Sequence, residues 1–386
     1  MGQFHSDTQA ALALNWAKIK ISRSQVQRIA RQLGNEMVQQ RDNKVVQRRR
    51  RELPVRVSVT PEVVAVEVDG GRLRTRAPER GPGVHEVQSK EEKVACLMTL
   101  QSQKSEHDPQ PEPPPSFRRP RRVRRLVAQM KRAAENPQDL QENPVEQEEQ
   151  TTEQSRSVKY RSCPRRLVRT CVASMACSDK FGPMMAAEAQ ERGFYQAKRR
   201  AFVADGALCN WSIHRGYFAD FEPITDFLHA LCYVYLAAMG TCESETEGWS
   251  LYEKWLRGCW QGRVCEVIEE LKVIQERVGH PPECEELDRK DPRRLVSDAL
   301  SYLSNNESRM DYPRYRREGL PVTSSLVESL VGEFNARVKS RGKCWNRPDG
   351  PEPILQLRAA VLSEDGRLDR FFAARPGYPY RNRNAA

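Results

Sequence analysis

Two short apolar runs, each ending in Asp-Gly, constrain the fold of this chain most strongly. Residues 63–68 read Val-Val-Ala-Val-Glu-Val and lead to Asp69, while residues 201–204 read Ala-Phe-Val-Ala and lead to Asp205. Apolar runs of this length that end in turn residues are typical of buried strands. We therefore predict a mixed α/β fold, in which Gly70-Gly71 turns the chain and residues 72–76 return as a hairpin partner. Residues 94–100 are expected to form a third strand.

Helical periodicity dominates much of the remaining sequence. Residues 184–192, 221–279, 293–305 and 325–339 repeat apolar positions at helical spacing. The most apolar stretch, residues 227–239, is shorter than the roughly 20 residues of a membrane span and contains His229. We therefore expect a buried helix there and no membrane association.

The first fifty residues are basic and helical in pattern. Ser24 is a candidate cap for a helix that runs to about Gln40. The preceding Ile-Ser-Arg-Ser turn resembles the start of the recognition helix in a helix-turn-helix, which predicts DNA contacts from Arg23 and Arg28. An ordinary amphipathic surface helix is the alternative.

Composition indicates a polyanionic partner and a reducing compartment. The 63 basic and 52 acidic residues leave a net charge of +11. The 11 cysteines include no Cys-x-x-Cys pair, which favours free thiols over disulfides or a zinc site. Eight basic residues between 118 and 132 precede seven acidic residues between 135 and 153. We expect residues 104–156 to be a disordered insert whose basic block either contacts phosphate or pairs with the acidic block.

Three acidic residues are candidate metal ligands: Asp69 and Asp205 at strand ends, and Glu328 near the start of a helix. Converging carboxylates repel one another unless a cation lies between them, and Mg²⁺ prefers such oxygen ligands. Two ions about 3.5–4 Å apart can activate an attacking oxygen and stabilise a leaving one. Each acid also has a simpler explanation: Asp-Gly is a turn pair, and Ser325 to Glu328 has the spacing of a capping box.

A resemblance makes the functional prediction specific. Residues 298–328, from Asp-Ala-Leu-Ser-Tyr to Ser-Ser-Leu-Val-Glu, resemble the C-terminal signature of bacterial insertion-sequence transposases of the ISKra type. The likeness continues through residues 334–339, 343–346 and 357–368. Upstream, Val66-Glu-Val-Asp-Gly-Gly and Val203-Ala-Asp-Gly resemble the first and second acidic motifs of that family. Asp226-Phe-Leu-His229 is similar to the Asp-x-x-His element that these and Mutator-like transposases carry.

The resemblance implies an RNase H-like core that cleaves the ends of a mobile element and joins the 3′-hydroxyls to target DNA. Asp69, Asp205 and Glu328 would bind two Mg²⁺ ions, with Mn²⁺ as a substitute. Asp226, His229 and Asn335 would support them. DNA contacts are expected from Arg23, Arg28, Arg337, Lys339 and Lys343. The protein would act as a homo-oligomer on double-stranded DNA in the bacterial cytoplasm, associated with the nucleoid.

The same resemblance divides the chain into segments. Relatives often carry more sequence before the first acid, so we expect a truncated N-terminal recognition region. The predicted plan is a helical DNA-binding segment (1–50), a catalytic core in three parts (51–103, 157–206, 293–362), the disordered insert (104–156), an all-helical insertion domain (207–292) and a basic flexible tail (363–386). A non-catalytic or decayed transposase-derived DNA-binding protein is the alternative function, and a general metal-dependent nuclease is a third.

Overall fold

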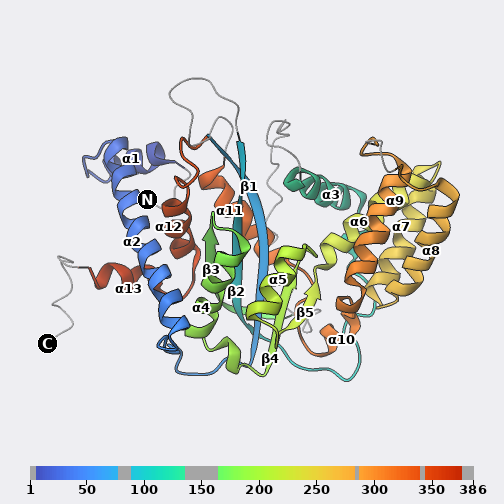
Figure 1. Cartoon of the computed structure of the whole chain (residues 1–386), viewed down its shortest axis with the longest axis horizontal. Coiled ribbons are helices and arrows are strands. Elements are labelled where there is room, and N and C mark those ends of the chain that lie inside the picture. Colours follow the sequence, from blue (N-terminus) through green and yellow to red (C-terminus); the bar gives the residue numbers. More distant parts are fainter. Residues whose placement is uncertain (1–5, 77–87, 135–163, 283–286, 340–343, 376–386) are drawn as a thin grey trace.

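A five-stranded mixed sheet lies at the centre of the computed structural model, which describes residues 6–76, 88–134, 164–282, 287–339 and 344–375 (Figure 1). The strand order is β3-β2-β1-β4-β5. Strands β1, β2 and β3 are antiparallel neighbours, whereas β4 and β5 run parallel to β1. The predicted α/β class is therefore confirmed. The strands are β1 (Val63–Thr75), β2 (Gln88–Gln101), β3 (Arg165–Ser174), β4 (Arg199–Ala204) and β5 (Glu222–Thr225).

The predicted hairpin at Gly70-Gly71 is wrong. Strand β1 continues through both glycines to Thr75, and its antiparallel partner is β2, with Gly71 opposite Glu92. The two glycines do not form a turn; they let Glu92 of β2 approach the β1 backbone closely. A Cβ on Gly70 would lie 2.9 Å from the Glu92 carbonyl oxygen, and one on Gly71 would lie 2.8 Å from Glu92 Oε1. A sequence pattern does not distinguish these two uses of glycine.

Helices cover both faces of the sheet. Even-numbered residues of β1, such as Val64 and Val66, pack against α4 (Ser178–Glu191) and α5 (Leu208–Tyr217). Odd-numbered residues, such as Val63 and Leu73, belong to the larger core on the other face. This second core includes residues of α11 (Ser325–Val338) and α12 (Glu352–Leu362).

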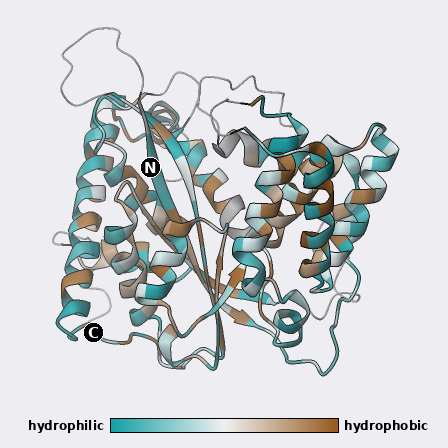
Figure 2. Ribbon diagram, turned by 45° about the vertical axis from the view of Figure 1, so that its right-hand side comes forward, coloured by the Kyte–Doolittle hydropathy of each residue, from teal (hydrophilic) through white to brown (hydrophobic). Residues whose placement is uncertain are grey.

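Four helices pack together beside β5 and extend the larger core. They are α6 (Phe227–Thr241), α7 (Glu245–Trp260), α8 (Val264–Val278) and α9 (Pro292–Asn306). Hydrophobic residues are frequent in this group and along the sheet (Figure 2). The short helices η5 (Glu307–Arg309) and α10 (Tyr312–Arg317) lead back to α11. The range 207–292 is not all-helical as predicted, because it contains β5, whose four residues Glu-Pro-Ile-Thr are too few to show a strand pattern.

Part of the insert expected to be disordered is folded. Residues 115–118 form η1 (Pro115–Arg118), and α3 (Pro120–Ala134) follows. Val123 and Val127 are buried, and α3 packs on α6. Apolar residues at four-residue spacing give this basic helix one buried face, which a count of charges conceals. The acidic residues from 135 to 153 lie outside the described ranges.

The N-terminal segment forms two helices, α1 (Asp7–Trp16) and α2 (Arg23–Arg49). The cap of α2 is Ser22, not Ser24 as expected: Ser22 and Gln25 form a capping box. Helix α2 extends about nine residues beyond the predicted end at Gln40 and packs on α12 and α4. In the segment expected to be a flexible tail, α13 (Arg367–Ala373) is helical, and residues 376–386 are not described. In the part of the chain that is described, no helix is both long and apolar enough to cross a membrane.

Candidate active site

Three aspartates follow aligned positions of three parallel strands. In the register of the sheet, Val68 of β1 lies beside Ala204 of β4, which lies beside Thr225 of β5. The next residues are Asp69, Asp205 and Asp226. Side chains alternate between the two faces of a sheet, and Val68 and Ala204 face α4 and α5. The alternation therefore places all three aspartates on the opposite face, which α11 covers. The parallel pairing of β1, β4 and β5 thus brings together residues that lie 136 and 21 positions apart in the sequence, although β1 itself continues past Asp69 to Thr75.

Asp69 has an environment that disfavours its negative charge. Its pKa is raised to about 6, chiefly by burial and also by the charges of Asp205 and Asp226. The charge of His229 and a hydrogen bond of 2.7 Å from the Gly70 N–H act in the opposite direction. Asp69 therefore lies close enough to Asp205, Asp226 and His229 for their charges to change its pKa. A cation bound there would relieve the repulsion among the aspartates.

Asp205 is held by the turn that follows it. Its Oδ1 accepts hydrogen bonds from the Ala207 N–H and from Asn210 Nδ2, both at 2.9 Å. Its backbone carbonyl accepts one from the Tyr302 hydroxyl at 3.0 Å. Gly206 has a φ of +96°, and a Cβ there would lie 2.9 Å from the Tyr302 ring. Glycine is therefore required at this position, and the Asp-Gly pair serves both as a turn and as the support of a carboxylate.

Asp226 connects three parts of the site. It is fully buried, and its Oδ1 accepts hydrogen bonds from the backbone N–H groups of Ser324, at 2.7 Å, and Leu228, at 3.3 Å. Its Oδ2 accepts from the His229 N–H, at 3.3 Å, and lies 2.6 Å from His229 Nδ1. Burial favours the neutral acid, but the bonds from His229 and Ser324 outweigh it and lower the pKa of Asp226. Asp226 therefore caps α6, orients His229 and fixes the start of α11.

His229 carries a positive charge at neutral pH. Burial opposes that charge, but the hydrogen bond and charge of Asp226 and the charges of Asp205 and Asp69 raise its pKa to about 9. An imidazolium cannot bind a metal ion, since both of its ring nitrogens hold protons. Its Nε2–H can instead donate a hydrogen bond to an anion beside the aspartates. The structure thus brings His229 to the predicted place as a cationic donor.

Glu328 belongs to the first turn of α11, whose start is tied by hydrogen bonds to the segment that carries Asp226. The helix begins at Ser325 with Ser324 at its cap position, one residue before the cap that a Ser325–Glu328 capping box requires. Besides the Ser324 bond to Asp226, the Phe227 N–H donates to the Val322 carbonyl at 3.0 Å. The first turn of α11 is therefore tied to the segment that carries Asp226. The Glu328 side chain lies outside the part of the structure that is described.

The other residues predicted on or after α11 have different surroundings. Arg337 is buried and forms an ion pair of 2.6 Å with Asp7 of α1, so it joins two helices rather than facing DNA. Lys339 is half-buried, and burial lowers its pKa. Asn335 Oδ1 is buried without a hydrogen-bond partner in the described chain. Lys343 lies outside the described residues.

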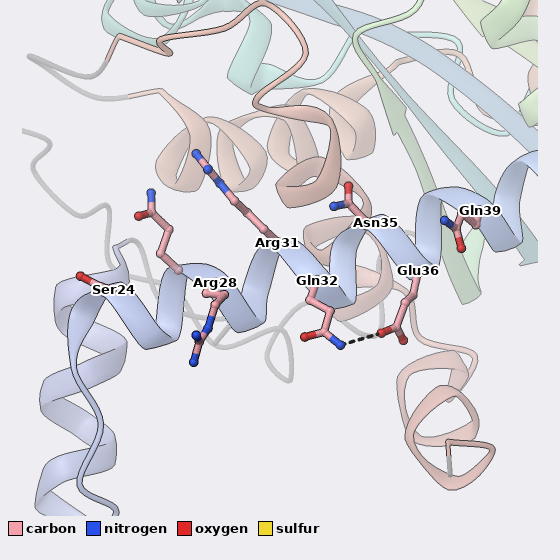
Figure 3. A pocket seen from close by; sticks show the side chains of 8 residues that line it. Ser24, Arg28, Arg31, Gln32, Asn35, Glu36 and Gln39 are labelled. Atoms are coloured by element: carbon pink, nitrogen blue, oxygen red, sulfur yellow. Dashed lines mark hydrogen bonds between the residues drawn. The ribbon is translucent and has the colours of Figure 1, made fainter.

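A second candidate surface lies on α2. Arg23 and Arg28 are both exposed on its first two turns, as predicted for DNA contact. The exposed side chains of this helix line a shallow hollow (Figure 3). Arginine, asparagine and glutamine are the side chains that read base edges most often. The hollow is lined by Ser24, Gln27, Arg28, Arg31, Gln32, Asn35, Glu36 and Gln39.

The donor set around Asp69 and Asp205 suits a hard divalent cation, because its ligating atoms are carboxylate oxygens. Among the described side chains, no group of three or more His, Cys, Asp or Glu is arranged to hold a metal ion. The third predicted ligand, Glu328, is not in that set. Neither protein-family models nor curated protein sequences match this chain.

Proposed function

We propose that this protein is a Mg²⁺-dependent DNA transposase of the ISKra type with an RNase H-like core. One observation carries the proposal: Asp69, within β1, lies next to the end of the parallel strand β4, which Asp205 follows, and Asp226 ties the helix of Glu328 to the same place. The sheet supports the RNase H-like assignment, since β1, β2 and β3 are antiparallel and β4 and β5 extend parallel to β1. A helical group between β5 and α11 matches the expected insertion.

In this proposal, Asp69, Asp205 and Glu328 hold two Mg²⁺ ions, which supply Lewis acidity for phosphodiester cleavage when they are bound. Asp226 does not compete for the ions, because both of its oxygens accept hydrogen bonds from protein groups. It keeps His229 protonated and oriented. The imidazolium Nε2–H then donates to a phosphate oxygen and offsets negative charge next to the aspartates. The exposed face of α2 contacts the ends of the element, and two copies of the protein bring two DNA ends together.

The test uses purified protein, Mg²⁺ or Mn²⁺, and labelled DNA from both flanks of its gene. We expect nicking at a defined end, followed by joining to a second duplex. Asp205→Asn should reduce the cleavage rate by at least about a hundredfold, because a neutral amide replaces a negatively charged metal ligand. Asp220→Asn is a matched control, since Asp220 is an exposed acid paired with Arg200. Equal cleavage by the unsubstituted protein and Asp205→Asn would disprove the proposal.

The face of α2 favours a second candidate, a transposase-derived protein that binds DNA without cutting it. Its side chains include arginine, asparagine and glutamine, which can contact bases whether or not the aspartates bind metal. Specific binding of the flanking DNA by both the unsubstituted protein and Asp205→Asn, with no metal-dependent cleavage by either, would favour this candidate. Cleavage without joining or end preference would favour a nuclease.

A further inference from the structure

Glu92 of β2 is a buried carboxylate that accepts no hydrogen bond from the described residues. Its side chain is 0% exposed, and neither Oε1 nor Oε2 has a hydrogen-bond partner in the described structure. An unpartnered buried carboxylate is costly whether charged or neutral, and such groups in native proteins call for a ligand, an ion or a functional role. Sequence analysis did not single out Glu92, because the run Lys-Glu-Glu-Lys from 90 to 93 looks like a solvated charged stretch.

The sheet places Glu92 beside the first acidic motif. Glu92 is opposite Gly71, two residues beyond Asp69 on the same face of β1. Its carboxylate lies over the Gly71 backbone, where a Cβ would be 2.8 Å from Oε1. The glycine thus opens the space that the carboxylate occupies. Helix α11, which carries Glu328, packs on both β1 and β2 over this face.

Two charges act on Glu92 from its surroundings. The pKa of Glu92 is raised to about 7: burial raises it most, the positive charge of Lys339 opposes the rise, and the negative charge of Asp69 adds to it. Lys339 is close enough to interact but forms no hydrogen bond with either oxygen, so it does not satisfy the carboxylate. Protonation would not satisfy it either, because a neutral acid would add an unpartnered O–H donor. A divalent cation between Glu92 and Asp69 would compensate both carboxylates at once.

We propose that Glu92 is a further ligand of the divalent cation that Asp69 binds, so that the metal site extends from β1 onto β2. This inference rests on the metal site of the proposed function. It adds a carboxylate that the three acidic motifs do not include. Glu92 would bind the metal ion whether or not the protein cleaves or joins DNA.

Mn²⁺ binding to the full-length protein without DNA tests the inference directly, by electron paramagnetic resonance of the free ion. We expect Glu92→Gln to weaken Mn²⁺ binding at least tenfold, because an amide keeps the shape of the side chain but loses its charge. Gly71→Ala should weaken binding as well, since the new methyl group displaces Oε1 without removing any charge. Glu91→Gln is the matched control: Glu91 is adjacent but exposed and pairs with Lys93.

Equal Mn²⁺ affinity of the unsubstituted protein and Glu92→Gln would overturn the inference, as would no Mn²⁺ binding by the unsubstituted protein. Thermal unfolding of each variant shows whether it is folded, and Gly71→Ala provides an independent test if Glu92→Gln is not. The proposed function is decided separately by the cleavage assay with Asp205→Asn. Glu92-dependent metal binding without DNA cleavage would support the ligand assignment and reject the transposase.

Discussion

Asp226 shows how a single carboxylate organises this site. Its two oxygens interact with Ser324, with Leu228, and with the backbone and ring of His229. The Asp226 N–H donates to the Ala204 carbonyl at 2.8 Å, next to Asp205. The residue therefore links β4, α6 and the start of α11 through hydrogen bonds rather than through a metal ion. Its partner His229 provides a measurable consequence.

Replacement of His229 by glutamine should change how stability depends on pH. The folded state raises the pKa of His229 from 6.5 to about 9, so its stabilising charge is fully present below pH 6.5. That contribution is lost as pH rises from 6.5 to about 9. We expect the free energy of unfolding of the unsubstituted protein to fall over this window, relative to His229→Gln, by on the order of 2 kcal/mol.

Urea unfolding at intervals between pH 6 and pH 9.5 measures both profiles. His280→Gln is the control, because the side chain of His280 is 68% exposed and its contact with Glu276 lies on the surface. This variant should follow the unsubstituted protein throughout. Parallel curves for the unsubstituted protein and His229→Gln would contradict the charged state of His229.

Two glycines within helices differ in the space available for an added methyl group. A Cβ on Gly34 of α2 would lie 2.0 Å from the carbonyl oxygen of Pro353, at the start of α12. A Cβ on Gly332 of α11 would have no heavy atom within 4 Å. Alanine is the better helix former, so only the tertiary contact separates the two positions.

We expect Gly34→Ala to destabilise the protein by about 3 kcal/mol, because the backbones of α2 and α12 must move apart. Gly332→Ala should stabilise it by about 0.5–1 kcal/mol, since the helix gains propensity without a clash. Denaturant unfolding of both variants gives the two values. A small or favourable effect of Gly34→Ala would show that α2 does not pack closely on α12.

Elements with a strong local pattern of apolar residues could be predicted from the sequence. Features that depend on contacts between residues far apart in the chain could not. Residues 63–68, 201–204 and 325–338 lie in elements of the expected kind, and the charges of Asp69, Asp205, Asp226 and His229 act on one another. Strand β3 was missed because arginines interrupt its apolar pattern. Arg337 was assigned to DNA because its partner Asp7 lies 330 residues away. Glu92 was overlooked since only the pairing of β2 with β1 brings it to the site.

The N-terminal helix α2 packs against the rest of the molecule and does not stand apart from it. The predicted boundary near residue 50 implies an independent DNA-binding segment. In the structure, Ala30 and Met37 of α2 belong to the larger core, and Val45 packs against the core on the other face. Lys44 also forms an ion pair of 2.5 Å with Glu191 of α4. Helix α2 thus lies against both cores of the sheet (Figure 1).

We therefore expect α2 to unfold together with the sheet in one cooperative transition. Native-state hydrogen exchange measures this, because amides that open only by global unfolding share one free energy. Amides of residues 34–41 should exchange with the same free energy as those of residues 64–68 in β1. Residues 8–14 of α1, which contact mainly α2, are the internal comparison and should exchange earlier. Exchange of residues 34–41 well before β1 would instead establish α2 as a unit that detaches from the core.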